Sequence, residues 1–185
     1  AKGYTGRELR FMLMGVHYRK PQLFSYKRLD AARTALRRID EYTCKLRCLP
    51  AGLPHPEVAS YVSELEKRFI DALNDDLNLS GAIGALFNFI KQTNPLVQLR
   101  HLDLEQKTDV LEALRMVNTV LGVLRLKHCP LTPEIDRLIR QRERARQLKD
   151  WTAADSAREE LLRQGVTILD TAAGPIWEQL EEGAE

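Results

Sequence analysis

The sequence predicts a mainly α-helical protein, in which an antiparallel helical bundle is followed by a small α+β domain. Apolar residues recur every three or four positions from near the start to about residue 164, as in amphipathic helices. Aromatic residues make up only 6% of the chain and charged residues 29%, which suits helices better than a β-sandwich or barrel. The β-branched stretch VTILD at 166–170 follows the last helical stretch and is typical of a strand.

Three helices are predicted in the first third of the chain. Thr5 and Glu8 form a capping box for the first helix, which Pro21 ends at the latest. Ser25 caps the second helix, which ends where Pro50 begins a loop, and the third helix follows that loop. The residues expected to face the core are Leu9, Met12, Leu13 and Val16; Leu29, Ala32, Leu36, Ile39 and Leu46; and Val58, Val62, Leu65, Phe69 and Leu73.

Two more helices complete the predicted bundle. The turn and cap residues of NDDLNLSG at 74–81 separate the third helix from a fourth, which Pro95 ends or kinks. The fifth helix is expected from about Asp103 to Leu126. The inward residues are Ile83, Leu86, Phe87 and Ile90 in the fourth, and Val110, Leu111, Leu114, Val117, Leu121 and Leu124 in the fifth. The short connections between these helices favour an antiparallel bundle.

The character of the sequence changes after residue 130. Thr132 and Pro133 have the residue types of an N-cap and a first helical position, so a sixth helix is expected to start there. A capping-box-like start at Thr152 and a glycine at 165 bound a seventh helix. VTILD, the turn TAAG and PIWEQ then predict a β-hairpin. The expected core is thin and comprises Ile135, Leu138, Ile139, Ala145, Leu148, Leu161 and Leu162.

The small net charge of +2 conceals an uneven distribution. Residues 1–49 carry twelve Lys or Arg against four Asp or Glu, a net of +8, so the remainder carries −6. Such an excess of positive charge favours a polyanion such as RNA over other kinds of binding partner.

Other sequence features restrict the class of protein. No apolar run approaches the roughly 20 residues of a membrane span and no signal-peptide pattern opens the chain, so we expect a cytoplasmic protein without membrane partners. Residue 1 is alanine, which indicates a fragment or a processed product. Cys44, Cys48 and Cys129 lack the paired spacing of a zinc ribbon, and we expect half-buried thiols rather than metal ligands or redox partners.

Trp151 lies between two charged helical stretches and has two interpretations. As the residue before a Thr152 cap, it would pack across the helix start as a hydrophobic staple, with Asp155 in the first turn. Alternatively, an aromatic ring near Arg146, Arg158 and a carboxylate could stack on an unpaired RNA base and hydrogen bond to its edge. Spacing alone leaves both open.

Three segments resemble a known family. LIRQRERARQLKDWTAADSAREELLRQGVTILDTAAGPIW at 138–177 is similar to the C-terminal end of bacterial cysteinyl-tRNA synthetases, with its arginine-rich helix, Lys-Asp/Asn-Trp hinge, Ala-Asp pair and Gly-Thr/Pro-x-Trp close. GYTGRELRFMLMGVHYRKPQLFS at 3–25 resembles the segment that follows the catalytic domain of that family. DALNDDLNLSGAIGALFNFI at 71–90 resembles its helical-bundle signature. The resemblance covers essentially the whole chain.

The resemblance implies the tRNA-binding part of such a synthetase, which would act in protein biosynthesis with cysteine tRNA as its partner. The residues that match the anticodon-reading positions are Arg146, Trp151, Asp155, Arg158 and Asp170. Trp151 would stack on a base, the arginines would donate to base edges or phosphates, and the aspartates would favour guanine over adenine. A second set matches the region that lies against the inside of the tRNA and comprises Arg7, His17, Tyr18 and Arg19.

The resemblance also implies a division of labour along the chain. Residues 1–24 would lead out of a catalytic domain, residues 25–129 would form the bundle typical of class I synthetases, and residues 130–185 would recognise the anticodon. The family's HIGH and KMSKS signatures and its zinc site do not occur in these 185 residues. We therefore expect this chain to have no cofactor and to be inactive by itself, whereas the parent ligase would use ATP and zinc. We also expect a monomer.

Two other hypotheses remain. The acidic end EQLEEGAE replaces the basic tail common in the family, which favours a separate paralogue that serves as a protein-interaction or regulatory module. A relative of the mycothiol cysteine ligases would share the His-Tyr-Arg region but lack the Trp151 hairpin.

Overall fold

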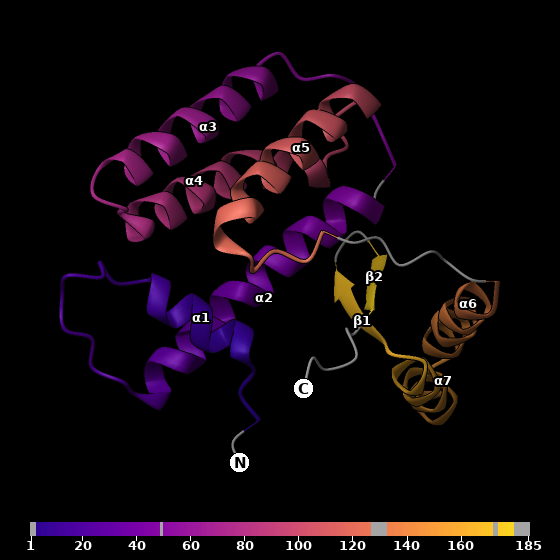
Figure 1. The fold of residues 1–185 in the computed structure, drawn as a ribbon. Helices are drawn as coiled ribbons and strands as arrows, with labels where there is room; N and C mark the ends of the chain where they lie inside the picture. Colours follow the sequence, from indigo (N-terminus) through magenta and orange to yellow (C-terminus); the bar gives the residue numbers. More distant parts are fainter. Residues whose placement is uncertain (1–2, 49, 127–132, 172–173, 180–185) are drawn as a thin grey trace. The chain divides into compact units, whose positions relative to one another are not determined.

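The structure is a computed structural model that describes residues 3–48, 50–126, 133–171 and 174–179 (Figure 1). The side chains of Pro133 and of residues beyond 168 are outside this description. The described residues form seven helices and two strands. The chain divides into two compact units, residues 1–126 and residues 127–185, and each is described here by itself.

The first unit is the predicted helical bundle. Its helices are α1 (Gly6–Met14), α2 (Tyr26–Cys48), α3 (Val58–Asn74), α4 (Leu79–Gln98) and α5 (Leu104–Leu121). Helix α3 packs on α4 and α5, α2 packs on α4, and α1 packs on α2 (Figure 1). Every core residue predicted for α2 is buried. Ser25 caps that helix as expected, since the Arg28 backbone N–H donates to its hydroxyl over 3.3 Å.

Helix α1 has the predicted capping box, but its buried face is rotated relative to the predicted one. Met12 is buried as predicted, whereas Leu9 and Leu13 are 41% and 52% exposed and Phe11 and Met14 belong to the core instead. Both faces of α1 are apolar, so polar anchors decide its rotation. Arg7 is paired with Asp40 and Glu8 with Arg33, both on α2, and these pairs turn Phe11 and Met14 inward.

The ends of α4 and α5 also differ from the prediction. Pro95 does not end α4, which continues to Gln98, with the Leu99 N–H donating to the Pro95 carbonyl over 2.9 Å. Helix α5 ends at Leu121 rather than at residue 126. Gly122 stops it by adopting a left-handed conformation (φ 61°), which glycine adopts without steric strain.

The second unit contains α6 (Pro133–Gln147), α7 (Trp151–Arg163), β1 (Val166–Thr171) and β2 (Gly174–Gln179). The helices pack as a hairpin, and the strands pair antiparallel with Val166 opposite Gln179 and Thr171 opposite Gly174. Gly165 follows the end of α7 with φ 72°, as its predicted capping role requires. The small core comprises Ile135, Leu138, Ile139, Leu161, Val166 and Ile168.

Glu8 links the α1 cap to α2. Its carboxylate accepts hydrogen bonds from the Thr5 backbone N–H (2.7 Å) and from Arg33 Nε (2.6 Å). Burial alone would raise the pKa of Glu8, but the hydrogen bonds from Arg33 and Thr5 outweigh burial and hold the pKa below its usual value. The stabilisation by this carboxylate is therefore present above its unfolded-state pKa and is lost as pH falls through the folded-state pKa.

Glu8→Gln should lower the free energy of unfolding at pH 7 by about 1 kcal/mol, because glutamine keeps the cap but loses the charge that Arg33 binds. The difference from the wild type should shrink as pH falls through the folded-state pKa of Glu8, because below it Glu8 is protonated in both states. Urea unfolding over a descending series of pH values measures it. A difference that does not change with pH would contradict the role of the charge.

Candidate nucleic-acid interface

The turn between α6 and α7 sets the position of the candidate site. The N–H groups of Lys149 and Asp150 donate to the carbonyls of Arg146 (3.0 Å) and Ala145 (2.8 Å), which is the Schellman pattern of a helix C-terminus. Lys149 takes the left-handed position with φ 59°. Asp150 then caps α7 at once, because its carboxylate accepts from the Ala153 N–H over 3.0 Å. Arg146 and Trp151 are thereby fixed on either side of one tight turn.

The prediction that Thr152 caps α7 is wrong, and this changes the interpretation of Trp151. Because Asp150 is the cap, Trp151 is the first residue of the helix rather than the residue before the cap. Its side chain is 60% exposed, so it does not pack across the helix start as a staple. Asp155 likewise lies beyond the first turn. The sequence offered two caps two residues apart, and the helix uses the earlier one.

Trp151, Asp155 and Arg158 lie on one exposed face of α7. Their spacing of four and three residues places them along a single line of the helix. Ala154, Ala157 and Leu161 form the buried face that packs in the second unit. The helix therefore presents an aromatic ring, a carboxylate and a guanidinium to solvent in that order.

The other two residues of the predicted anticodon-reading set are on neighbouring elements. Arg146 is exposed in the last turn of α6. Asp170 is in β1, opposite Pro175 of β2, and its side chain is outside the described residues.

Helix α6 adds a basic stripe that the sequence analysis did not single out. Arg137, Arg140 and Arg144 are exposed at helical spacing and line a surface groove of about 530 Å³ with Asp136 and Gln141. Asp136 pairs with Arg140 over 2.9 Å. Their three- and four-residue spacing was the signal that could have identified this stripe.

The carboxylate of Asp76, in the first unit, is contacted by three of the predicted inner-face residues: His17, Tyr18 and Arg19. Tyr18 donates its hydroxyl to Asp76 Oδ1 (2.7 Å), and Arg19 Nε donates to Oδ2 (2.7 Å). His17 Nε2 lies 3.7 Å from Oδ2, and its ring stacks on Tyr18 with centroids 4.9 Å apart. The hydrogen bond from Arg19, followed by that from Tyr18, lowers the pKa of Asp76. The same contact with Asp76 raises the pKa of Tyr18.

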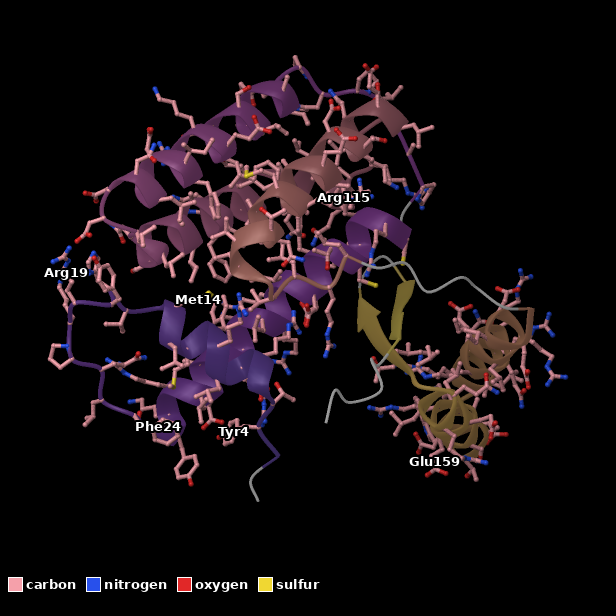
Figure 2. The ribbon with its side chains drawn as sticks, viewed as in Figure 1. Tyr4, Met14, Arg19, Phe24, Arg115 and Glu159 are labelled. Carbon is pink, nitrogen blue, oxygen red and sulfur yellow. The ribbon has the colours of Figure 1, made fainter. Side chains whose placement is uncertain are left out.

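Asp76, which lies in the loop between α3 and α4, is a site residue that the sequence did not predict. Its left-handed φ of 51° is one that aspartate tolerates better than most residues. The pair DD after a helical stretch was the only local signal for it. Figure 2 shows Arg19 on the segment between α1 and α2, close to that loop.

Arg7 lies inside the first unit. Its Nη1 donates to Asp40 Oδ2 (2.7 Å), its Nη2 contacts Oδ1, and its Nε donates to the Val123 carbonyl (2.6 Å). The side chain is 18% exposed. Arg7 thus joins α1 and α2 to the segment after α5, and its contact with tRNA stays a prediction.

No three His, Cys, Asp or Glu side chains in the described part of the chain lie close enough together to hold a metal ion. Cys44 is buried and Cys48 exposed at the end of α2, with sulfur atoms 3.7 Å apart. Cys129 is outside the described residues. None of the described helices has the length and apolar character that a membrane crossing requires.

Comparisons with known proteins find a match to a protein family within each unit. Residues 68–125 match the DALR domain family, and residues 129–177 match the family described as the cysteinyl-tRNA ligase anticodon binding domain. A cysteine–tRNA ligase of Chlamydia trachomatis (serovar A) is 34% identical over 94% of this chain and 39% of its own length. That of Chlamydia pneumoniae is 37% identical over 93% of this chain and 37% of its own length.

The match extends to Protochlamydia amoebophila, whose cysteine–tRNA ligase is 27% identical over 94% of this chain. The chain spans a little over a third of the length of these relatives. Over nearly its whole length the chain is therefore similar to one part of these cysteine–tRNA ligases, and it matches the DALR domain and the cysteinyl-tRNA ligase anticodon binding domain.

Proposed function

We propose that this chain binds cysteine tRNA and that the exposed face of α7 reads the anticodon. One observation carries the proposal: Trp151 is 60% exposed on the same helix face as Asp155 and Arg158. An exposed ring next to hydrogen-bonding side chains suits the recognition of an unstacked base. The match of residues 129–177 to an anticodon-binding family supports the same assignment.

Each side chain has a distinct proposed role. Trp151 stacks on an anticodon base, while Arg146 and Arg158 donate to base edges or phosphates. Asp155 and Asp170 accept from an amino or imino group, which favours guanine over adenine at the positions they read. The stripe of Arg137, Arg140 and Arg144 on α6 is suited to phosphates, because guanidinium groups bind them in pairs of hydrogen bonds.

The bundle contributes position rather than base recognition. We propose that residues 25–129 place the tRNA, that residues 1–24 lie against its inner face through Arg7, His17, Tyr18 and Arg19, and that residues 130–185 recognise the anticodon. The chain acts as a monomer in the cytoplasm and needs no cofactor for this binding. Ligation of cysteine is the activity named for relatives more than twice as long, and we assign this chain the recognition step.

The mycothiol ligase hypothesis predicts a chain without an anticodon hairpin, whereas residues 129–177 match that domain. The acidic end that favours an interaction module lies largely outside the described residues.

Separate substitutions of Arg158 and Asp155 distinguish binding to the charged phosphates from recognition of the bases. Arg158→Ala should weaken binding of cysteine tRNA, and if Arg158 binds a phosphate, the slope of log affinity against log salt should fall by about 0.7 to 0.9. Asp155→Asn should leave that slope unchanged but reduce discrimination against tRNAs with altered anticodons. Fluorescence anisotropy of labelled tRNA across a salt series measures both. Wild-type affinity of both variants for every tRNA would exclude α7 from the interface.

A further inference from the structure

Three aromatic side chains cluster at the N-terminal end of α2 in the first unit: Tyr4, Phe24 and Tyr26, here called the Tyr26 cluster. The rings of Tyr4 and Tyr26 stack with centroids 6.0 Å apart, and Phe24 meets Tyr26 edge-on at 6.0 Å. Phe24 is 56% exposed and Tyr26 50%. Figure 2 shows Tyr4 and Phe24 at this same end of the helix.

The Tyr26 cluster is held in place through Tyr4, which contacts two further residues of α2. The Tyr4 hydroxyl donates to Asp30 Oδ1 over 2.6 Å, and the Arg33 guanidinium lies 4.4 Å above the Tyr4 ring. Arg33 is itself fixed by Glu8 (2.6 Å) and by the Gly3 carbonyl (2.7 Å). The exposed rings of Phe24 and Tyr26 therefore rest on an ordered support, so binding to them would cost little side-chain entropy.

The surroundings of the cluster are strongly basic. Residues 20–38 carry six Lys or Arg and one Asp. Lys27 and Arg28 are exposed next to Tyr26, and neither forms an ion pair with another residue in the described ranges. Both lie in the first turn of α2, which has no acidic residue, and cations there oppose the helix dipole. A bound anion would offset this repulsion.

Exposed aromatic rings beside cations are the combination that binds single-stranded nucleic acid, by stacking of bases and neutralisation of phosphates. An apolar protein partner would use the rings but would leave the charge of Lys27 and Arg28 uncompensated. The charge therefore selects RNA as the occupant of this surface.

We propose that the Tyr26 cluster, with Lys27 and Arg28, is an RNA contact of this chain in addition to the α7 face and the inner-face residues. An unpaired nucleotide stacks on Phe24, and the adjoining phosphates bind Lys27 and Arg28. The contact adds affinity without reading sequence, because every base has a face that can stack. It rests on the proposed function, since the RNA is the tRNA whose anticodon α7 reads.

The test compares cysteine tRNA with the same tRNA carrying a different anticodon, by anisotropy with the complete chain. Phe24→Ala should weaken binding of both tRNAs by the same factor, about 5- to 150-fold, whereas Phe24→Tyr, which keeps the ring, should bind as the wild type does. The double variant Lys27→Gln, Arg28→Gln should lower the salt slope by about 0.7 to 0.9 for each lost phosphate contact. Circular dichroism melting checks that each variant is folded.

Matched controls remove similar side chains elsewhere on the first unit. Ile70→Ala removes an exposed apolar residue from α3, and Lys67→Gln with Lys91→Gln removes two exposed cations from α3 and α4. If Phe24→Ala bound tRNA as tightly as Ile70→Ala does, in a chain that still discriminates anticodons, the contact at the Tyr26 cluster alone would be overturned. A wild type that binds neither tRNA would overturn both proposals.

Discussion

Trp151→Ala is expected to weaken binding of cysteine tRNA by about 1 to 3 kcal/mol, or about 5- to 150-fold, because it removes the ring on which an anticodon base stacks. The free energy of unfolding should change by less than about 0.5 kcal/mol, because the side chain is 60% exposed and does not staple the helix. Anisotropy with labelled tRNA and urea unfolding followed by circular dichroism measure the two quantities on the same sample.

Two control variants separate stacking from helix stability. Asp150→Ala removes the cap of α7 and should lower the free energy of unfolding by about 1 kcal/mol. Leu99→Ala removes an exposed apolar side chain from the first unit and should change neither quantity. If Trp151→Ala resembled Asp150→Ala in stability and Leu99→Ala in affinity, Trp151 would be a structural residue.

Arg7→Ala is expected to have the largest effect on stability, about 3 kcal/mol, because it leaves the Asp40 carboxylate buried without its guanidinium partner. It also removes the donor to the Val123 carbonyl, which ties α1 to the segment after α5. Urea unfolding of the wild type and the variant measures the loss.

Arg37→Ala is the matched control for Arg7. Arg37 faces Glu41 on the surface of α2 at 3.9 Å with 66% of its side chain exposed, so its removal should cost no more than about 0.5 kcal/mol. The double variant Arg7→Met, Asp40→Leu should recover much of the lost stability, because no unpaired charge remains buried. Arg7→Ala with unchanged stability but weaker tRNA binding would instead support its predicted role on the inner face.

The number and type of helices followed from the sequence because each has a strong apolar period and clear end signals. The direction of side chains was less predictable where the local sequence allowed two helix orientations or two helix starts equally well. Helix α1 has two apolar faces, and only the pairing of Arg7 and Glu8 with residues on α2 decides between them. In the same way, Asp150 and Thr152 both have the residue types of a good N-cap. Helix α7 begins after Asp150, and in this helix Ala154 and Ala157 are buried.

The shared helix face of Trp151, Asp155 and Arg158 followed from the sequence, because spacings of four and three residues within one helix place side chains on one face. Their role in reading the anticodon stays a prediction. The cluster around Asp76 could not be predicted, because His17 and Arg19 are separated from Asp76 by more than 50 residues of sequence and meet it only through the fold. Arg7 was predicted to contact tRNA from its motif alone, and the motif carries no information about its long-range partner Asp40.

The most direct test of the central claim uses the wild-type chain and two tRNAs at one fixed salt concentration. If α7 reads the anticodon, cysteine tRNA should bind about tenfold or more tightly than the same tRNA with a substituted anticodon, since each lost base contact costs about 1 to 3 kcal/mol. Equal affinity for the two tRNAs would contradict the claim that the exposed face of α7 reads the anticodon.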